Sequence, residues 1–314
     1  MTARCLNPLL LALCGAGSAF GWGCEAHQMM ALTTRAHLTP AASRAVNELL
    51  NAFPMDPNLK RFCRDRQTDV MADSATWADD VRVKLDDPWH FIDIPLSTVK
   101  PVADLTPWCG PIDPSVRGGQ ASGCVTSAIA FNRRILENRT LPGAQRADAL
   151  RFLIHFFGDI TQPLHNVSDT GGNCSSVHFY DQERPTNIHS LWDSGILTHV
   201  RNQRKTGSAA LFSAMDGRFA RQGKAWAKAE PDPVAWSWEA HRIGVEMAYG
   251  LLSPRIPAEL REMEDNCDAE RAKVAELNIQ VGDSYVNRVW PVIEEQMMKS
   301  AYRLAGYLNR TFGN

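Results

Sequence analysis

Two pairs of histidine and aspartate stand out in the sequence through their residue types and their spacing. His155 and Asp159 are four residues apart in the apolar run FLIHFFGDI, and His189 and Asp193 repeat that spacing in NIHSLWD. Residues four apart lie on one face of an α-helix, so each pair can present two metal ligands from a rigid frame. Zinc is bound by imidazole nitrogen and carboxylate oxygen, and two such pairs therefore indicate a zinc site, although a structural hydrogen bond would explain either pair alone.

Three further candidate ligands lie close to these pairs or upstream of them. Pro163 should end the first helix and let His165 turn toward the same site. Upstream, Asp79 follows an aromatic residue in WADDVR, and His90 lies where a long loop begins in WHFID. Such an aspartate is usually solvated and such a histidine usually belongs to the core, so each supports a metal site only in combination with the pairs.

Residues 1–21 have the pattern of a secretory signal peptide: a positive charge, an apolar stretch, and small residues before a cut after Gly21. We therefore expect residues 22–314 to form the mature protein, which would be secreted or periplasmic. Cleavage would give Trp22 a free α-amine, and such an amine can bind zinc together with His27. The alternative is an aromatic side chain near a frayed terminus.

Helical periodicity of apolar residues predicts the elements that must position these side chains. The segments with this periodicity are 41–52, 125–136, 147–160, 188–197, 234–252 and 289–308. Strand-like alternation is scarce, and the stretches 88–124 and 169–185, rich in Pro, Gly and Asp, are typical of long loops. No linker or low-complexity tract divides the chain, so we predict one all-α, mainly helical domain.

Cysteine usage and charge limit the function classes. Two of the eight cysteines lie in the signal, which leaves Cys24, Cys63, Cys109, Cys124, Cys174 and Cys267. An even number in an exported chain predicts up to three disulfides stapling the loops, or some buried thiols, and spacing does not select the pairing. The net charge of -2, or -3 without the one arginine of the signal, excludes a basic clamp for duplex nucleic acid. No segment after the signal is long and apolar enough to span a membrane.

Taken together, these motifs resemble the zinc-dependent, single-strand-specific nucleases of the S1/P1 type. The resemblance runs from the start WGCEAH to the tail, which includes PVIEEQ at residues 291–296 and RLA at residues 303–305. It implies a phospholipase C/nuclease-like fold and a cluster of three Zn²⁺ ions. Nine positions carry the residue types that the family uses as ligands.

The resemblance distributes these nine positions over three zinc ions. A buried zinc would be bound by Asp79, His90, His155 and Asp159. A second would be bound by the Trp22 amine and carbonyl, by His27 and by a bridging Asp159, and a third by His165, His189 and Asp193.

The resemblance also implies residues that contact the substrate. Phe91 would stack on a base, and Asp93 and Asn173, with Gly171, would complete a pocket around the hydrogen-bonding edge of that base. Core packing is the alternative for Phe91. Arg82 replaces a lysine that is common near the scissile phosphate, and a guanidinium offers a planar fork in place of a point charge.

Ala26 replaces a common family glycine beside the predicted ligand His27. We expect these two departures from the family pattern to change substrate preference and not to abolish activity. The catalytic set implied by the resemblance is Asp79, Arg82 and Asp159.

The implied reaction is hydrolysis of single-stranded DNA and RNA to 5′-phosphorylated products, with 3′-nucleotidase activity, by a metal-activated hydroxide that attacks phosphorus. Single strands and nucleotides would be the partners, and we expect a monomer with no stable protein partner and no membrane association. A zinc-dependent phospholipase C is the main alternative, since it has a related fold and ligand order. A non-enzymatic metal-binding protein is a weaker one, because it gives no reason for open metal positions.

Overall fold

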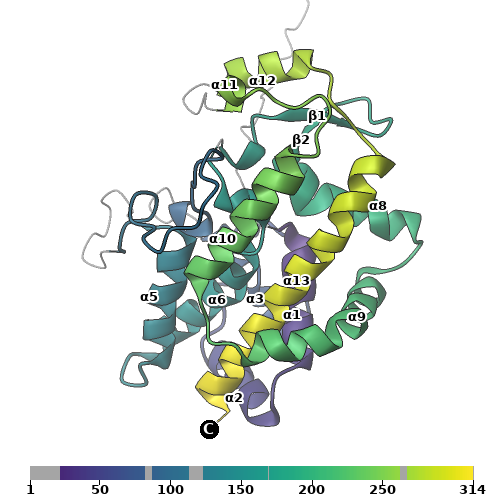
Figure 1. Cartoon of the computed structure of the whole chain (residues 1–314). Helices are drawn as coiled ribbons and strands as arrows, with labels where there is room; N and C mark the ends of the chain where they lie inside the picture. The colour runs from purple at the N-terminus through teal and green to yellow at the C-terminus, as the bar shows by residue number, and fades with distance from the viewer. Residues whose placement is uncertain (1–21, 82–86, 113–122, 169, 262–266, 314) are drawn as a thin grey trace, which may run out of the picture.

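The computed structural model describes residues 22–81, 87–112, 123–168, 170–261 and 267–313 (Figure 1). The predicted signal peptide lies outside these residues. The helices are α1 (Cys24–Ala36), α2 (Pro40–Ala52), α3 (Val70–Ser74), α4 (Trp77–Asp80), α5 (Val125–Glu137), α6 (Gly143–Asp159), α7 (Ile188–Ser190), α8 (Ile196–Gln203), α9 (Ser208–Lys228), α10 (Pro233–Ile243), α11 (Ala258–Arg261), α12 (Cys267–Glu276) and α13 (Asp283–Phe312). The prediction of a mainly helical fold is confirmed.

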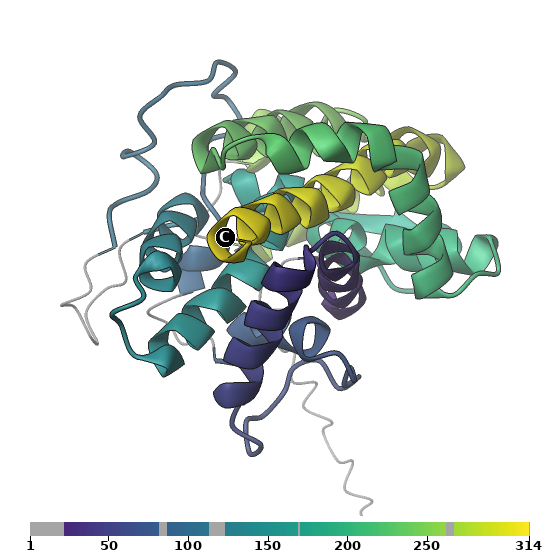
Figure 2. The ribbon, with the colours of Figure 1, turned by 90° about the horizontal axis from the view of Figure 1, so that it is seen from below.

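The long helix α13 lies at the centre of the helical packing. It packs against α9, α1, α6 and α2, and Figure 2 shows these helices gathered around it when the molecule is viewed from below. Its buried side includes Val289, Ile293, Met297 and Ala301, which are spaced four apart and therefore form one apolar stripe. Helix α13 contacts both α1 and α6, and α1 and α6 also contact each other.

Helix α6 is buried almost all round in its second half. From Leu153 to Asp159 every residue is buried, and the aromatic rings of Phe156 and Phe157 are among the largest fully buried side chains. A helix buried on all sides is normally apolar. The polar residues His155 and Asp159 within it therefore require a specific reason.

A small sheet departs from the all-helical expectation. Strand β1 (Ser176–Phe179) pairs antiparallel with β2 (Thr186–Asn187) and parallel with β3 (Gln280–Val281), in the order β2-β1-β3. Strand β1 lies within the stretch 169–185 predicted as a loop, and β2 directly follows that stretch. Strands of two to four residues are too short for alternation to show, and β3 is contributed from a distant part of the sequence.

Three disulfides fasten the loops, as the cysteine content predicts. They join Cys24 to Cys63, Cys109 to Cys124 and Cys174 to Cys267. The last spans 93 residues and ties the loop before β1 to the start of α12. Within the described residues, no helix is long and apolar enough to cross a bilayer.

Candidate metal centre

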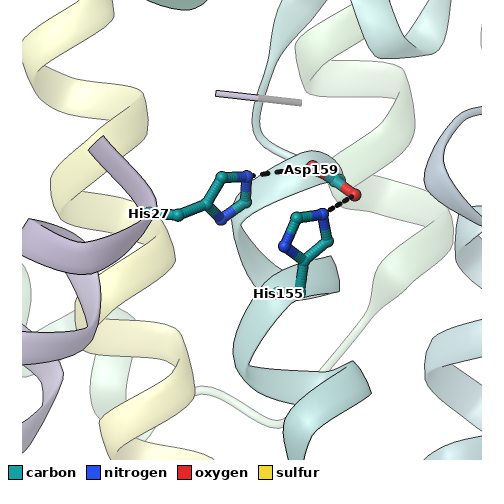
Figure 3. Close-up of side chains that lie close together, drawn as sticks. All are labelled: His27, His155 and Asp159. Carbon is teal, nitrogen blue, oxygen red and sulfur yellow. Dashed lines mark ion pairs between the residues drawn. The ribbon is translucent and has the colours of Figure 1, made fainter. Parts of the chain in front are cut away.

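The centre of the site is the C-terminal end of α6, where Asp159 is the last helical residue (Figure 3). The negative end of the helix dipole disfavours a carboxylate at this position. His27 from α1 and His155 from the preceding turn of α6 point toward its two oxygens. His155 Nε2 lies 3.0 Å from Asp159 Oδ2, and His27 Nε2 lies 3.3 Å from Asp159 Oδ1. One carboxylate is therefore shared by histidines from two helices.

A first group of potential ligands lies on the Oδ2 side of this carboxylate. His90 Nδ1, at the end of the short 3-10 helix η1 (Asp87–His90), lies 3.0 Å from Asp159 Oδ2 and 3.2 Å from His155 Nε2. Asp79 of α4 lies opposite, with Oδ1 at 3.7 Å from His90 Nδ1 and 3.6 Å from His155 Nε2. The ligand atoms of Asp79, His90 and His155 are close enough to hold one metal ion.

A second group lies on the Oδ1 side and comprises His27, His155 and Asp159. The rings of His27 and His155 are stacked, with centroids 4.0 Å apart and planes inclined by 9°. Gly158 makes this approach possible, since a Cβ atom there would lie only 2.8 Å from His27 Nδ1. The missing side chain of Gly158 therefore provides the space for the His27 ring.

A third group comprises His165, His189 and Asp193. His165 lies in the 3-10 helix η2 (Pro163–Asn166), and Asp193 lies in the π-helical turn η4 (Leu191–Gly195) that follows α7. His189 Nε2 is 3.1 Å from Asp193 Oδ2, and the rings of His165 and His189 are stacked at 5.1 Å. Gln162 donates a hydrogen bond of 2.6 Å to the other oxygen of Asp193.

Three of the histidines are oriented by backbone carbonyls. Nδ1 of His155 donates to Ala75 O at 2.7 Å, Nδ1 of His165 to His90 O at 2.8 Å, and Nδ1 of His189 to Gly171 O at 2.8 Å. Because a carbonyl only accepts, each Nδ1 carries the hydrogen and each Nε2 is left with a lone pair in the neutral ring. Metal-binding histidines are typically held in this way.

The electrostatics of the site call for a cation. Burial would raise the pKa of Asp159, but the charge of His155 and the close ring nitrogens of His155, His27 and His90 outweigh it and hold that pKa well below its ordinary value. Burial alone would lower the pKa of His155, yet the charges of Asp159 and Asp79 raise it to about 9. Burial and the charge of His155 lower the pKa of His27, which favours the neutral form of this ring. A proton on His155 thus balances part of the buried negative charge, which a metal ion would balance instead.

Four buried atoms in the site show where such an ion fits. Both ring nitrogens of His27, Asp79 Oδ1 and Asp159 Oδ1 make no hydrogen bond within the described part of the chain. An unsatisfied buried polar atom is costly, and buried carboxylates are normally paired or bound to metal. The donor set of nitrogen and carboxylate oxygen suits a transition metal ion such as zinc.

Trp22 lies beside the second and third groups. Its side chain is buried, and the indole nitrogen donates to Thr161 Oγ1 at 3.2 Å, just beyond the end of α6. The backbone N–H of Gly23 donates to Asp193 O at 3.0 Å. The residue is therefore held between α6 and η4, and it is not a frayed terminal aromatic.

Residues predicted to contact the substrate lie around this centre. Phe91 and Asp93 follow His90, and Ile92 between them donates its N–H to His165 O at 2.8 Å. Phe91 is partly buried and Asp93 is exposed.

Gly171 belongs to the second segment of the predicted pocket. It has a φ of +60° and accepts a hydrogen bond from His189 through its carbonyl, and partly buried Asn173 follows two residues later. Arg82 lies outside the described residues.

The histidines not predicted as ligands have other partners. His241 is buried, with its ring nitrogens 2.8 Å from Asn166 O and 2.9 Å from Thr98 O. His37 pairs with Asp216. His199 stacks on Tyr180, and His178 lies in β1; neither belongs to a ligand group among the described residues.

Sequence reasoning did not single out Gln162. Its side chain orients Asp193, and its Oε1 also accepts the N–H of Leu164 at 2.6 Å and so caps the helix that bears His165. A proline at the first helical position is a helix-start signal, and Pro163 therefore marks the preceding residue, Gln162, as a possible cap.

Known proteins resemble this chain over nearly its whole length. The family model described as S1/P1 Nuclease matches residues 22–313. Endonuclease 2 of Arabidopsis thaliana is 29% identical, with 96% of this chain and 94% of the relative covered. Nuclease P1 of Penicillium citrinum is 28% identical, with 93% and 98% covered, and Nuclease S1 of Aspergillus oryzae is 26% identical, with 92% and 91% covered. The chain therefore belongs to the S1/P1 nuclease family and is a hydrolase of the nuclease class.

Proposed function

We propose that this protein is a zinc-dependent endonuclease that cleaves single-stranded DNA and RNA to 5′-phosphorylated products and also acts as a 3′-nucleotidase. The observation that carries the proposal is the set of three buried His/Asp groups at and beside Asp159, in which four buried polar atoms have no hydrogen-bond partner among the described residues. Relatives named Nuclease S1 and Nuclease P1 support a nucleic-acid substrate over a phospholipid.

We assign the first zinc to Asp79, His90, His155 and Asp159. The second takes His27, the shared Asp159, and the amine and carbonyl of Trp22. The third takes His165, His189 and Asp193. The ligand atoms of Asp79, His90 and His155 lie close together, as do those of His165, His189 and Asp193, which supports the first and third sites. Asp159 Oδ2 lies 3.0 Å from both His90 and His155, and Asp159 Oδ1 lies 3.3 Å from His27, which supports a shared carboxylate.

The metal charge accounts for phosphate affinity in an acidic protein. Asp79, Asp159 and Asp193 contribute three negative charges against six positive charges on three zinc ions, so the site carries about three net positive charges. When bound, the ions would supply Lewis acidity, which acidifies water and stabilises charge on the phosphate. A chain with a net charge of -2 therefore needs no basic groove.

In this proposal, side chains around the metal centre position the substrate. Phe91 stacks on one base, Asp93 and Asn173 bind its polar edge beside Gly171, and Arg82 contacts the scissile phosphate. A base can enter such a pocket only after it has left the stack, which costs a few kcal/mol in a duplex. This cost gives the preference for single strands.

Export completes the site in this proposal. Removal of residues 1–21 creates the amine of Trp22, and the anchoring of its indole by Thr161 and of the next residue, Gly23, by Asp193 O holds it beside the metals. The three disulfides suit an oxidising compartment such as the periplasm or the extracellular space. We expect the mature protein to act as a monomer.

The test uses the mature chain prepared in three forms: zinc-loaded, chelated, and chelated then resupplied with zinc. The loaded and resupplied forms should release acid-soluble nucleotides from single-stranded DNA and RNA much faster than from duplex DNA, and the chelated form should be inactive. The Asp159→Asn variant should be inactive, whereas the control His37→Gln, at a partly exposed histidine outside the ligand groups, should keep its activity. Release of phosphocholine from phosphatidylcholine without nucleotide release would contradict the proposal.

A further inference from the structure

A cavity of about 370 Å³ opens beside the third ligand group. This volume is within the range of about 300–1,000 Å³ found for small-molecule sites. Its wall is formed by the start of α1, by the segment from α7 to α8, and by one aromatic ring from the loop after α2. The lining includes Glu25, Phe62, His189, Asp193, Leu197 and Thr198.

Phe62 is the unusual member of this wall. It is 48% exposed, and it is one of only four large hydrophobic residues exposed in the described part of the chain. An exposed ring on a flexible loop would need no explanation. Phe62 does need an explanation, because contacts of its backbone keep the ring exposed beside the metal centre.

The backbone around Phe62 is fixed on both sides. Cys63 is disulfide-bonded to Cys24 at the start of α1, and the N–H of Phe62 donates to Asp80 Oδ1 at 2.6 Å. On the other side, Arg61 pairs with Asp80 and donates to the backbone oxygen of Asp73 at 2.8 Å. Asp80 directly follows Asp79, so the loop bearing Phe62 is coupled to the ligand segment.

The cavity does not coincide with the predicted base pocket. Among the described residues that line it, none belongs to the set Phe91, Asp93, Gly171 and Asn173. Gly171 contacts His189 at Nδ1, the nitrogen that does not face Asp193. A nucleic-acid strand has a nucleoside on each side of the scissile phosphate, and the base pocket accounts for one of them only.

The charge around the cavity does not oppose a nucleotide. Among the described lining residues, Glu25 is the one acidic residue besides the ligand Asp193, and its carboxylate pairs with Arg201 at 2.6 Å. Leu197 adds an apolar surface, while Thr198 and two serines of the wall offer hydroxyl groups. An aromatic ring with small polar neighbours suits a base face and a sugar.

We propose that this cavity binds the nucleoside on the 5′-phosphate side of the cleaved bond, with its base stacked on Phe62. The proposal rests on the proposed nuclease function and adds a second base site to it. Stacking is open to every base, so the site contributes affinity without sequence preference.

A double-mutant cycle between protein and substrate tests the contact. The substrates are a dinucleoside monophosphate and the same molecule with an abasic sugar in place of its second nucleoside. In the wild-type protein the second base should raise kcat/KM by about fivefold to a hundredfold, the range that base stacking provides. In Phe62→Ala this advantage should fall to near one, and Phe62→Trp should restore it.

The matched control is Phe53→Ala, which removes the other exposed phenylalanine, 37% exposed, from a position outside the cavity. This control should keep the full advantage of the second base. An advantage that survives in Phe62→Ala would overturn the proposal, as would an equal loss in the control.

Equilibrium binding separates this proposal from the proposed function. An uncleavable methylphosphonate dinucleotide should bind Phe62→Ala about fivefold or more weakly than wild type in calorimetry, and its abasic analogue should bind both proteins equally. A wild-type protein that cleaves neither substrate would contradict the nuclease proposal, and the calorimetric comparison would still decide the role of Phe62. Equal binding of the dinucleotide to both proteins would overturn that role.

Discussion

Replacement of Gly158 by alanine should damage the metal centre although alanine is the better helix former. The new Cβ atom would lie 2.6 Å from His27 Cε1 and 2.8 Å from His27 Nδ1. Carbon atoms in contact are normally about 3.5–4.0 Å apart, so the ring must withdraw by roughly 1 Å. Metal-ligand distances tolerate shifts of about 0.2 Å, and the proposed second zinc should therefore lose His27.

The expected result is a loss of metal and of rate. A displacement of about 1 Å at a reacting centre can cost on the order of a hundredfold in rate, and we expect at least this decrease in kcat on single-stranded DNA. Mass spectrometry of the loaded protein should show one zinc fewer than wild type. The melting temperature should not rise, because overpacking costs about 1–3 kcal/mol against about 1 kcal/mol of helix propensity.

Gly217→Ala is the matched control. Gly217 also lies within a helix, α9, but apart from its chain neighbours and the backbone of its own helix, no described atom lies within 4 Å of the position of a new Cβ. This variant should keep its zinc and activity and should gain about 0.5–1 kcal/mol in the free energy of unfolding. If Gly158→Ala behaved like Gly217→Ala in all three measurements, the packing argument for His27 would be refuted.

Three other changes have defined outcomes. Gln162→Leu removes the hydrogen bond to the third ligand group, so zinc competition with a chelator should show about 10–100-fold weaker binding of one ion, and unchanged binding would contradict this role. Glu239→Gln should lower the free energy of unfolding by about 1–3 kcal/mol near neutral pH, because Arg303 and a lysine lower the pKa of Glu239 below its ordinary 4.5 despite burial. The stabilisation by the Glu239 carboxylate is complete above pH 4.5 and is lost as pH falls through the folded-state pKa. Urea titrations should therefore show a difference in unfolding free energy between wild type and Glu239→Gln that is largest at neutral pH and shrinks toward acid pH. A difference that does not change with pH would contradict the charge argument. Replacing Cys174 and Cys267 by serine opens a loop of 93 residues. On chain-entropy grounds, denaturant unfolding should show a free energy of unfolding that is lower by about 4.6 kcal/mol. A decrease below about 1 kcal/mol would contradict that account.

Local patterns explain which parts of the site were predictable. His155 and Asp159 are four residues apart, so any helix places them on the same face. The helix around them is strongly apolar, so the sequence predicts both their contact and their burial. Their contacts with His27, Asp79 and His90 depend on the packing of α1, α4 and η1 around α6. Spacing carries no information on such contacts, so the sequence marked these residues as separate candidates and only the family resemblance assigned them to particular zinc ions.

The missing elements have physical reasons as well. Helix α9 is 21 residues long, but only four of its residues are buried, so its apolar periodicity is weak. The predicted helix 234–252 is real, yet it changes from α10 to the π-helical turn η5 (Gly244–Tyr249), and a 3.6-residue period does not foresee that change. Disulfide pairing and the fixed exposure of Phe62 likewise arise from tertiary contacts.

Native mass spectrometry of the mature, zinc-saturated chain tests the metal assignment most directly. We predict three zinc ions per wild-type chain. Asp159→Asn should retain only the ion held by His165, His189 and Asp193, because the other two groups share the carboxylate that this variant removes. A fully active wild-type chain with fewer than three ions, or an Asp159→Asn chain that keeps all three, would contradict the assignment.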